Sequence, residues 1–150
     1  MAETILTPID LTEMETSAKV LETAVQFAEI KKGALVALTV VPDIVAGIDF
    51  RYAIRGETGG SAGLNMEKIV ADALARLNEV IEQHTPSGMK VRTIARHGPI
   101  YEEILDVAKS VGATQIVMGA HNPGLADFML GSNTDRVMRH AKCSVSVVRG

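Results

Sequence analysis

The fold is decided by residues 115–149, which read QIVMGAHNPGLADFMLGSNTDRVMRHAKCSVSVVR. An apolar run at 115–118 ends in a glycine, a loop follows, and a helical pattern from about Ser132 to His140 leads to a second apolar run at 145–148. A strand, a helix and a strand in this order predict a βαβ unit, whose two strands lie parallel and are joined by a right-handed crossover.

The same alternation extends through the rest of the chain. Apolar runs rich in Ile, Val, Leu or Thr predict strands at Thr4–Ile9, Ala34–Val41 and Val91–Ala95. The third of these carries arginine on one face, which is typical of a strand near a sheet edge. The complete order, β-α-β-α-β-α-β-α-β, predicts an α/β fold with an open, doubly wound sheet of five parallel strands and helices on both faces. The pattern alone leaves two strand orders open, 3-2-1-4-5 and 2-1-3-4-5.

Apolar residues recur at helical spacing between the strands. The first stripe runs from Ala18 to Ala28, and Gly33 lies where a glycine would close that helix. A second stripe runs from Met66 to Ile81, and a third covers Ile100–Val111 before Gly112. In the fourth helix we expect two residues inside, Val137 and Met138, and two outside, Arg136 and Arg139.

Length and composition restrict the class of protein. The 150 residues carry 15 Lys+Arg against 18 Asp+Glu, so we expect a single domain spanning 1–150, with no nucleic acid or anionic membrane as its main partner. Cys143 is the one cysteine, which excludes an internal disulfide and favours a reducing compartment. No apolar stretch reaches the length of a membrane span and no signal-peptide pattern is visible, so we expect a cytoplasmic protein. The irregular stretch Pro42–Gly63 is long for a connection and indicates either a lid or interaction loop or a plain surface excursion.

Candidate ligand-binding residues follow the strands, because ligands of doubly wound sheets bind beyond the carboxyl ends of the strands. Asp10 follows the first strand, where it either caps the next helix, a role Thr12 or Thr16 could share, or contacts a ligand. Glycines at 119 and 131 would let a ligand approach the backbone. The backbone amides, hydroxyls and side-chain amide of 131–134 at a helix start suit a phosphate, and an ordinary Ser or Asn N-cap is the alternative.

Two segments resemble a known family. The pattern Gly119-x-His121, then LGSN at 130–133, then VMRHAKCSVSVVR at 137–149 looks like the signature of the universal stress proteins, and ILTPID at 5–10 is similar to their first strand. The resemblance covers essentially the whole chain. In the ATP-binding branch the signature reads glycine, two residues, glycine, nine residues, glycine and Ser/Thr. Here Asn122 takes the second glycine position and eight residues separate it from Gly131, as in the F-type subgroup, which the tail resembles most closely.

The resemblance implies a Rossmann-like, adenine nucleotide alpha hydrolase-like fold with strand order 3-2-1-4-5 and ATP bound between the first and fourth strands. It also implies a homodimer, or a higher oligomer, formed through the fifth strand at Val145, Val147 and Val148. Because a bare carboxylate repels a triphosphate, Asp10 would face the base or ribose, or act through Mg²⁺. The implied contacts are Pro8, Ile9, Asp10 and Leu11 beside adenine and ribose, Val40 on the adenine wall, Met118, Gly119 and His121 along the ribose and phosphates, and Gly131, Ser132, Asn133 and Thr134 on the phosphates.

Two classes of function follow from this interpretation. The first is an ATP-binding stress-response or signalling module, and the second is a dimeric interaction module that binds no nucleotide. No catalytic residue is predicted, because His121, Asp127 and Ser132 are close only in sequence, and slow ATP hydrolysis is the one reaction left open. The four histidines lack the spacing of metal ligands, so no metal site is predicted in the protein.

Overall fold

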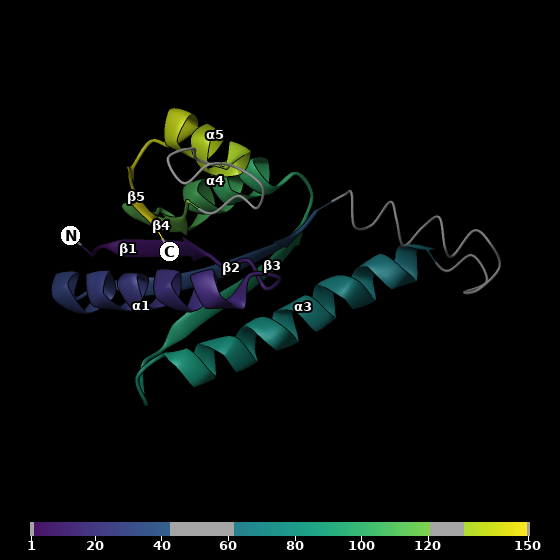
Figure 1. The fold of residues 1–150 in the computed structure, drawn as a ribbon, viewed down its shortest axis with the longest axis horizontal. Coiled ribbons are helices and arrows are strands. Elements are labelled where there is room, and N and C mark those ends of the chain that lie inside the picture. The colour runs from purple at the N-terminus through teal and green to yellow at the C-terminus, as the bar shows by residue number, and fades with distance from the viewer. Residues whose placement is uncertain (1, 43–61, 121–130, 150) are drawn as a thin grey trace.

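The computed structural model describes residues 2–42, 62–120 and 131–149. Along these ranges strands and helices alternate as the sequence predicts (Figure 1). The elements are β1 (Thr4–Pro8), α1 (Met14–Lys31), β2 (Ala34–Val41), α3 (Ala62–His84), β3 (Val91–His97), α4 (Ile100–Val111), β4 (Gln115–Gly119), α5 (Ser132–His140) and β5 (Ser144–Val148).

The strands form one five-stranded sheet in the order β3-β2-β1-β4-β5, and every neighbouring pair is parallel. This confirms the predicted doubly wound sheet and selects 3-2-1-4-5 over 2-1-3-4-5. The chain first winds from β1 through β2 to β3 and then returns to add β4 and β5 on the other side. The strand order therefore reverses between β1 and β4.

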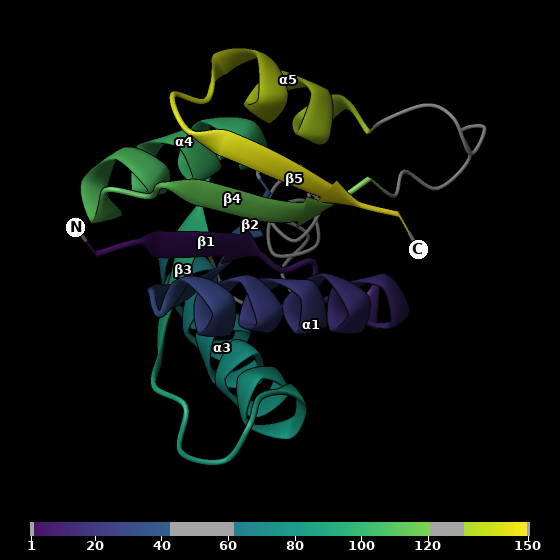
Figure 2. The same ribbon diagram turned by 90° about the vertical axis from the view of Figure 1, so that its left-hand side faces the viewer.

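Helices cover both faces of the sheet (Figure 2). On one face, Ile5, Leu35 and Val117 pack in a cluster with α1 and α3, which we call the α1/α3 core. Their neighbours Leu6, Val36 and Ile116 pack in a second cluster with α4 and α5, the α4/α5 core. Successive side chains of a strand point to opposite faces, so apolar residues at consecutive positions supply both cores.

Helices α1 and α4 are each closed by a residue in the left-handed conformation. Gly112 ends α4 with φ 66°, as predicted, but the corresponding residue of α1 is Lys32, with φ 52°. The predicted closing role of Gly33 is therefore wrong. A Cβ at residue 33 would lie 2.6 Å from the carbonyl oxygen of Glu3, so the absence of a side chain there lets the chain pass close to the start of β1.

One predicted core residue faces the solvent. In α5, Val137 is fully buried, whereas Met138 is 45% exposed, so its assignment to the core is wrong. Thr134, Val137 and Ala141 lie three and four residues apart on the side that faces the α4/α5 core, and Met138 lies about 100° around the helix from Val137.

The long stretch after β2 is described only at its two ends. Helix α3 begins at Ala62, so the last two residues of the expected irregular stretch Pro42–Gly63 are helical. Residues 43–61 lie outside the described residues, and the prediction of a lid or interaction loop lies there with them. None of the helices that the structure describes is long and apolar enough to cross a membrane.

Candidate functional site

The sheet opens between β1 and β4 at the carboxyl ends of these strands. β1 pairs with β2 from Thr4 to Pro8, and β4 pairs with β5 along its whole length, but β1 and β4 pair only at Ile5–Gln115 and Leu6–Ile116. Further along, the Ile9 amide donates to the Leu38 carbonyl of β2 at 2.7 Å, and the Ala120 amide donates to the Val148 carbonyl of β5 at 3.0 Å.

The two halves of the sheet therefore part beyond Leu6 and Ile116. We call the region between residues 7–10 and 117–120 the β1/β4 opening. It lies where the strand order reverses, which is the place where doubly wound sheets bind ligands.

Two threonine hydroxyls border the β1/β4 opening. The fully buried Thr7 donates from Oγ1 to the Val117 carbonyl at 3.0 Å. Thr134, which is 4% exposed, donates from Oγ1 to the Gly119 carbonyl at 2.8 Å and so fastens the start of α5 to the end of β4. The hydroxyl hydrogen of Thr134 is used in this bond, so its backbone amide is the donor that it can offer to a ligand.

The first turn of α5 lies at the same end of the sheet. Gly131 is the N-cap residue with φ −63° and ψ 152°, and no side chain caps the helix. The predicted alternative of a Ser or Asn N-cap is therefore wrong. Because any residue can adopt these dihedral angles, backbone conformation does not explain a glycine at this buried position. The first intrahelical bond runs from the Asp135 amide to the Gly131 carbonyl at 2.9 Å, so the amides of 132–134 precede it and suit an anion.

Asn133 links this turn to the neighbouring helix. Its Oδ1 accepts a hydrogen bond from the Tyr101 amide in the first turn of α4 at 3.2 Å. One turn further along α5, the Arg136 guanidinium lies 4.9 Å from the centroid of the Tyr101 ring. These two contacts hold the starts of α4 and α5 together.

Asp10 braces the turn that follows β1. Its exposed carboxylate accepts hydrogen bonds through Oδ1 from the amide and the hydroxyl of Thr12, at 2.9 and 2.5 Å. Its carbonyl oxygen accepts from the Ser17 hydroxyl at 2.6 Å. The N-cap residue of α1 is Glu13, without a side-chain capping bond, so the predicted capping role of Asp10 is wrong and the ligand contact stays a prediction.

The other predicted contacts divide between the two faces of the sheet. Val40 and the buried Met118 pack with the α4/α5 core, and Pro8 lies on this face by alternation with Leu6. Ile9 and Leu11 instead pack with the α1/α3 core. His121 and the linker with Asn122 lie outside the described residues. Sequence reasoning missed Thr7, whose signal is a hydroxyl inside an otherwise apolar strand directly before a proline.

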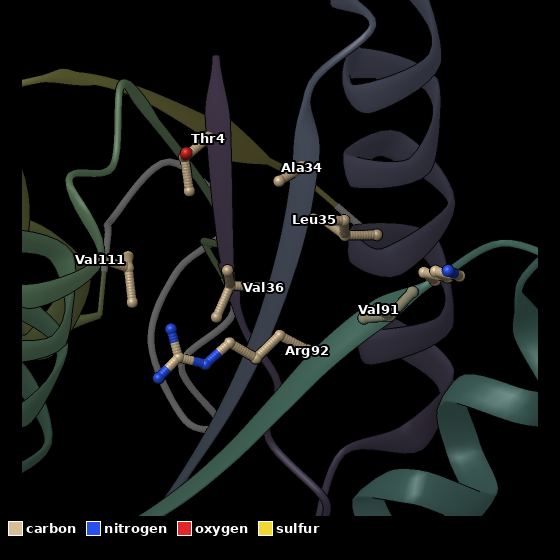
Figure 3. Close-up of a pocket in the computed structure, with 8 residues that line it drawn as sticks. Thr4, Ala34, Leu35, Val36, Val91, Arg92 and Val111 are labelled. Carbon is tan, nitrogen blue, oxygen red and sulfur yellow. The ribbon is translucent and has the colours of Figure 1, made fainter. Parts of the chain in front are cut away.

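A separate depression of about 460 Å³ lies at the opposite end of the strands, where β1, β2 and β3 begin (Figure 3). It is formed by the starts of β1, β2 and β3 and the end of α4, and Arg92 extends from β3 toward Val36 (Figure 3). No predicted site residue lines this depression. Among the described residues, no group of three or more His, Cys, Asp or Glu could hold a metal ion.

Cys143 lies outside the β1/β4 opening and packs against the α4/α5 core. Burial raises the pKa of its thiol, which lowers the fraction of reactive thiolate at neutral pH. This environment fits a small core residue better than a nucleophile.

Comparison with known proteins identifies the family. The family model described as "Universal stress protein family" matches residues 1–149. Universal stress protein G of Escherichia coli O157:H7 is 30% identical over 160 residues, with 99% of this chain and 100% of that protein covered. The Bacillus subtilis universal stress protein YxiE is 29% identical over 150 residues, with 99% and 100% covered. These relatives do not support the predicted placement beside the F-type proteins or in the ATP-binding branch.

Solved structures show the same fold. A hypothetical protein whose biochemical function was assigned from its structure superposes with a TM-score of 0.77 at 25% identity, covering 99% of this chain and 96% of that one. A universal stress protein in complex with cAMP has a TM-score of 0.63 at 20% identity, with 99% and 97% covered. One from Archaeoglobus fulgidus in complex with dAMP has a TM-score of 0.58 at 18% identity, with 97% and 96% covered. With its 3-2-1-4-5 sheet and its match from residue 1 to residue 149, the chain belongs to the universal stress protein family.

Proposed function

We propose that this universal stress protein binds ATP in the β1/β4 opening and acts as a nucleotide-dependent stress-response or signalling module of the cytoplasm. One observation carries the proposal. The pairing of β1 with β4 stops at Leu6 and Ile116, and the uncapped start of α5 is fastened to that end of β4 by Thr134. An opening in the sheet and an anion-binding helix terminus therefore lie together, as a nucleotide requires.

The residues divide into a base end and a phosphate end. Pro8, Val40 and Met118 share one face and supply apolar surface for adenine, while Ile9 and Leu11 contribute backbone. The exposed Asp10 carboxylate accepts hydrogen bonds from the ribose hydroxyls. The phosphates lie against Gly119, His121, the N-cap residue Gly131 and the first residues of α5, which are Ser132, Asn133 and Thr134.

Mg²⁺ would enter with the nucleotide. The described residues offer no cluster of protein ligands for it, so phosphate oxygens and water would fill most of its coordination positions. Asp10 is the carboxylate at the end of β1 that could reach the ion directly or through water.

Titration calorimetry tests this proposal. The solved relatives with cAMP and dAMP make adenine nucleotides the appropriate series, so ATP, AMP and cAMP are each titrated with and without Mg²⁺. We expect ATP to bind with a Kd near the micromolar range, about −8 kcal/mol. GTP is the control for recognition of the base. No heat and no thermal stabilisation with millimolar ATP would favour the interaction module that binds no nucleotide.

Hydrolysis requires a separate measurement. The sequence predicts no catalytic residue, so we expect ATP to remain intact in the complex over many binding cycles. Release of phosphate from bound ATP, followed by chromatography, would identify a slow ATPase.

We further propose that β5 pairs with a second copy of this chain. In the described part of the chain β5 lies at the sheet edge and pairs only with β4, and Val145, Val147 and Val148 are half-buried. Val145 packs with the α4/α5 core and Val148 with the α1/α3 core, so a partner strand would be flanked by apolar surface on both faces. A two-fold axis across β5 would pair the two edges antiparallel.

A further inference from the structure

The orientation of the β4 backbone identifies the carbonyls that face the β1/β4 opening. Alternate residues of a strand direct their N–H and C=O groups to opposite neighbours. The amide of Ala120 bonds to β5, so even-numbered residues at this end of β4 face β5. The carbonyls of Val117 and Gly119 therefore face β1.

The backbone of β1 offers no donor to the first of these carbonyls. The amide of Ile9 bonds to β2, so residue 8 faces β4. With Leu6 opposite Ile116, the next backbone donor to Val117 would be the amide of residue 8. Residue 8 is a proline and has no N–H, so the ladder cannot continue.

Side-chain hydroxyls bond both carbonyls instead. Thr7 bonds to Val117 and Thr134 bonds to Gly119, and both threonines are at least nine-tenths buried. We infer that Thr7 and Thr134 are positioning residues, which hold the backbones of β1 and β4 at a fixed separation beyond Leu6 by donating hydroxyl hydrogen bonds to the Val117 and Gly119 carbonyls. Pro8 ends the pairing and the two hydroxyls make the parted strands stable without a ligand. The connection to nucleotide binding rests on the function proposed above.

Loss of either hydroxyl should change the β1/β4 opening. A buried carbonyl without a donor is unfavourable, so in Thr7→Ala the strands would shift or water would enter to reach Val117. In either case the backbone at both sides of the opening would be less ordered. A ligand would then bind to a site that is no longer preformed.

Paired serine and alanine variants isolate the hydroxyl. Thr7→Ser and Thr7→Ala both lose the methyl group, and only the alanine variant loses the donor; Thr134→Ser and Thr134→Ala form a second pair. Thr85→Ala is the matched control, because Thr85 also donates its hydroxyl to a carbonyl, that of Ile81 at 2.6 Å, at the remote end of α3. The readouts are amide exchange at Ile9 and Ala120 without ligand, and ATP affinity by calorimetry.

We expect the alanine variants at 7 and 134 to exchange the Ile9 and Ala120 amides several-fold faster and to bind ATP about tenfold more weakly. Thr85→Ala should match the wild type in both measurements, and the serine variants should match it in amide exchange. Equal exchange in the serine and alanine variants would overturn the inference, even if both bind ATP. A wild type that binds no ATP but shows the exchange difference would refute the proposed ligand and support the role of the two threonines. If an alanine variant does not fold, the valine variant at the same position, which keeps the volume and removes the hydroxyl, is compared with the wild type instead.

Discussion

Lys32 and Gly112 occupy the same position at the ends of α1 and α4, and both adopt the left-handed backbone conformation, although only one of them is glycine. Their φ angles are 52° and 66°. In each case the following amide bonds back to the helix at 2.9 Å, from Gly33 to Ala28 and from Ala113 to Ala108. The two helices thus end in the same motif, and a lysine side chain makes the conformation less favourable at one of them.

We expect Lys32→Gly to raise the free energy of unfolding by about 1 kcal/mol and Gly112→Ala to lower it by about 1 kcal/mol. A Cβ added at Gly112 would lie more than 4 Å from the neighbouring atoms that the structure describes, so backbone conformation alone accounts for the second effect. Urea denaturation curves of both variants provide the measurement. Lys32→Ala, which removes the same charge and keeps a Cβ, is the control for loss of the lysine charge. A Lys32→Gly protein less stable than the wild type would contradict this explanation.

At the phosphate end, we expect Gly131→Val to abolish ATP binding. Gly131 is buried, and a branched side chain there would occupy the space in which a phosphate must approach the backbone. Ser132→Ala removes one exposed hydroxyl and should weaken binding by only about 1 kcal/mol. Calorimetry measures both, and circular dichroism checks that each variant is folded. A folded Gly131→Val protein with normal ATP affinity would place the site elsewhere.

At the sheet edge, we expect Val147→Lys to convert a dimer into a monomer. The charged side chain would project from the same face as Val145, where it would replace apolar contact between the two paired β5 strands. Sedimentation velocity at tens of micromolar compares the variant with the wild type. Arg149→Lys, two residues further on, is the control, since it changes a side chain near the same edge without adding charge. A wild-type monomer, or a dimer unaffected by Val147→Lys, would count against this interface.

Cys143 should react slowly with thiol reagents. Burial raises the pKa of its thiol, so less thiolate is present than for a free cysteine at every pH below that pKa. We expect labelling by a disulfide reagent at pH 8 to be slower in the native protein than in guanidinium chloride, and to accelerate as the pH rises. The absorbance of the released thiolate follows the reaction. A native rate equal to the denatured rate would show that the thiol is exposed.

Element order and most element boundaries could be predicted because they depend on local periodicity. β2, α4 and α5 have the predicted bounds, β1 ends one residue earlier, at Pro8, and β4 includes Gly119. β3 extends two residues past the predicted Ala95, because Arg96 and His97 pair with Val40 and Val41 of β2. Polar residues can extend an edge strand in this way, and a search for apolar runs does not detect such an extension.

The details of the candidate site depend on contacts between distant residues. The hydroxyls of Thr7 and Thr134 bond to carbonyls 110 and 15 residues away. These acceptors depend on how the strands and α5 are placed in space, which the type of residue at 7 or 134 does not indicate. Asp10 and Ser132 were both plausible helix caps by sequence, yet Glu13 and Gly131 take those positions. Capping depends on where the helix axis starts, and packing against the sheet determines that.

The short pairing between β1 and β4 also has a mechanical meaning. One half of the sheet consists of β3, β2 and β1, and the other consists of β4 and β5. Between the halves, β1 and β4 pair at two register positions, flanked by hydrogen bonds between Thr4 and Thr114 and between Thr7 and Val117, whereas the strands inside each half pair over five or more positions. This joint is where partial unfolding would separate the molecule at least cost. A ligand that contacts both halves binds only while they are together. At a concentration of 100 times its Kd, it therefore raises the free energy of separating them by about 2.7 kcal/mol. Ligand binding would then stabilise the whole sheet against separation into these two halves, without a change in the conformation of the sheet.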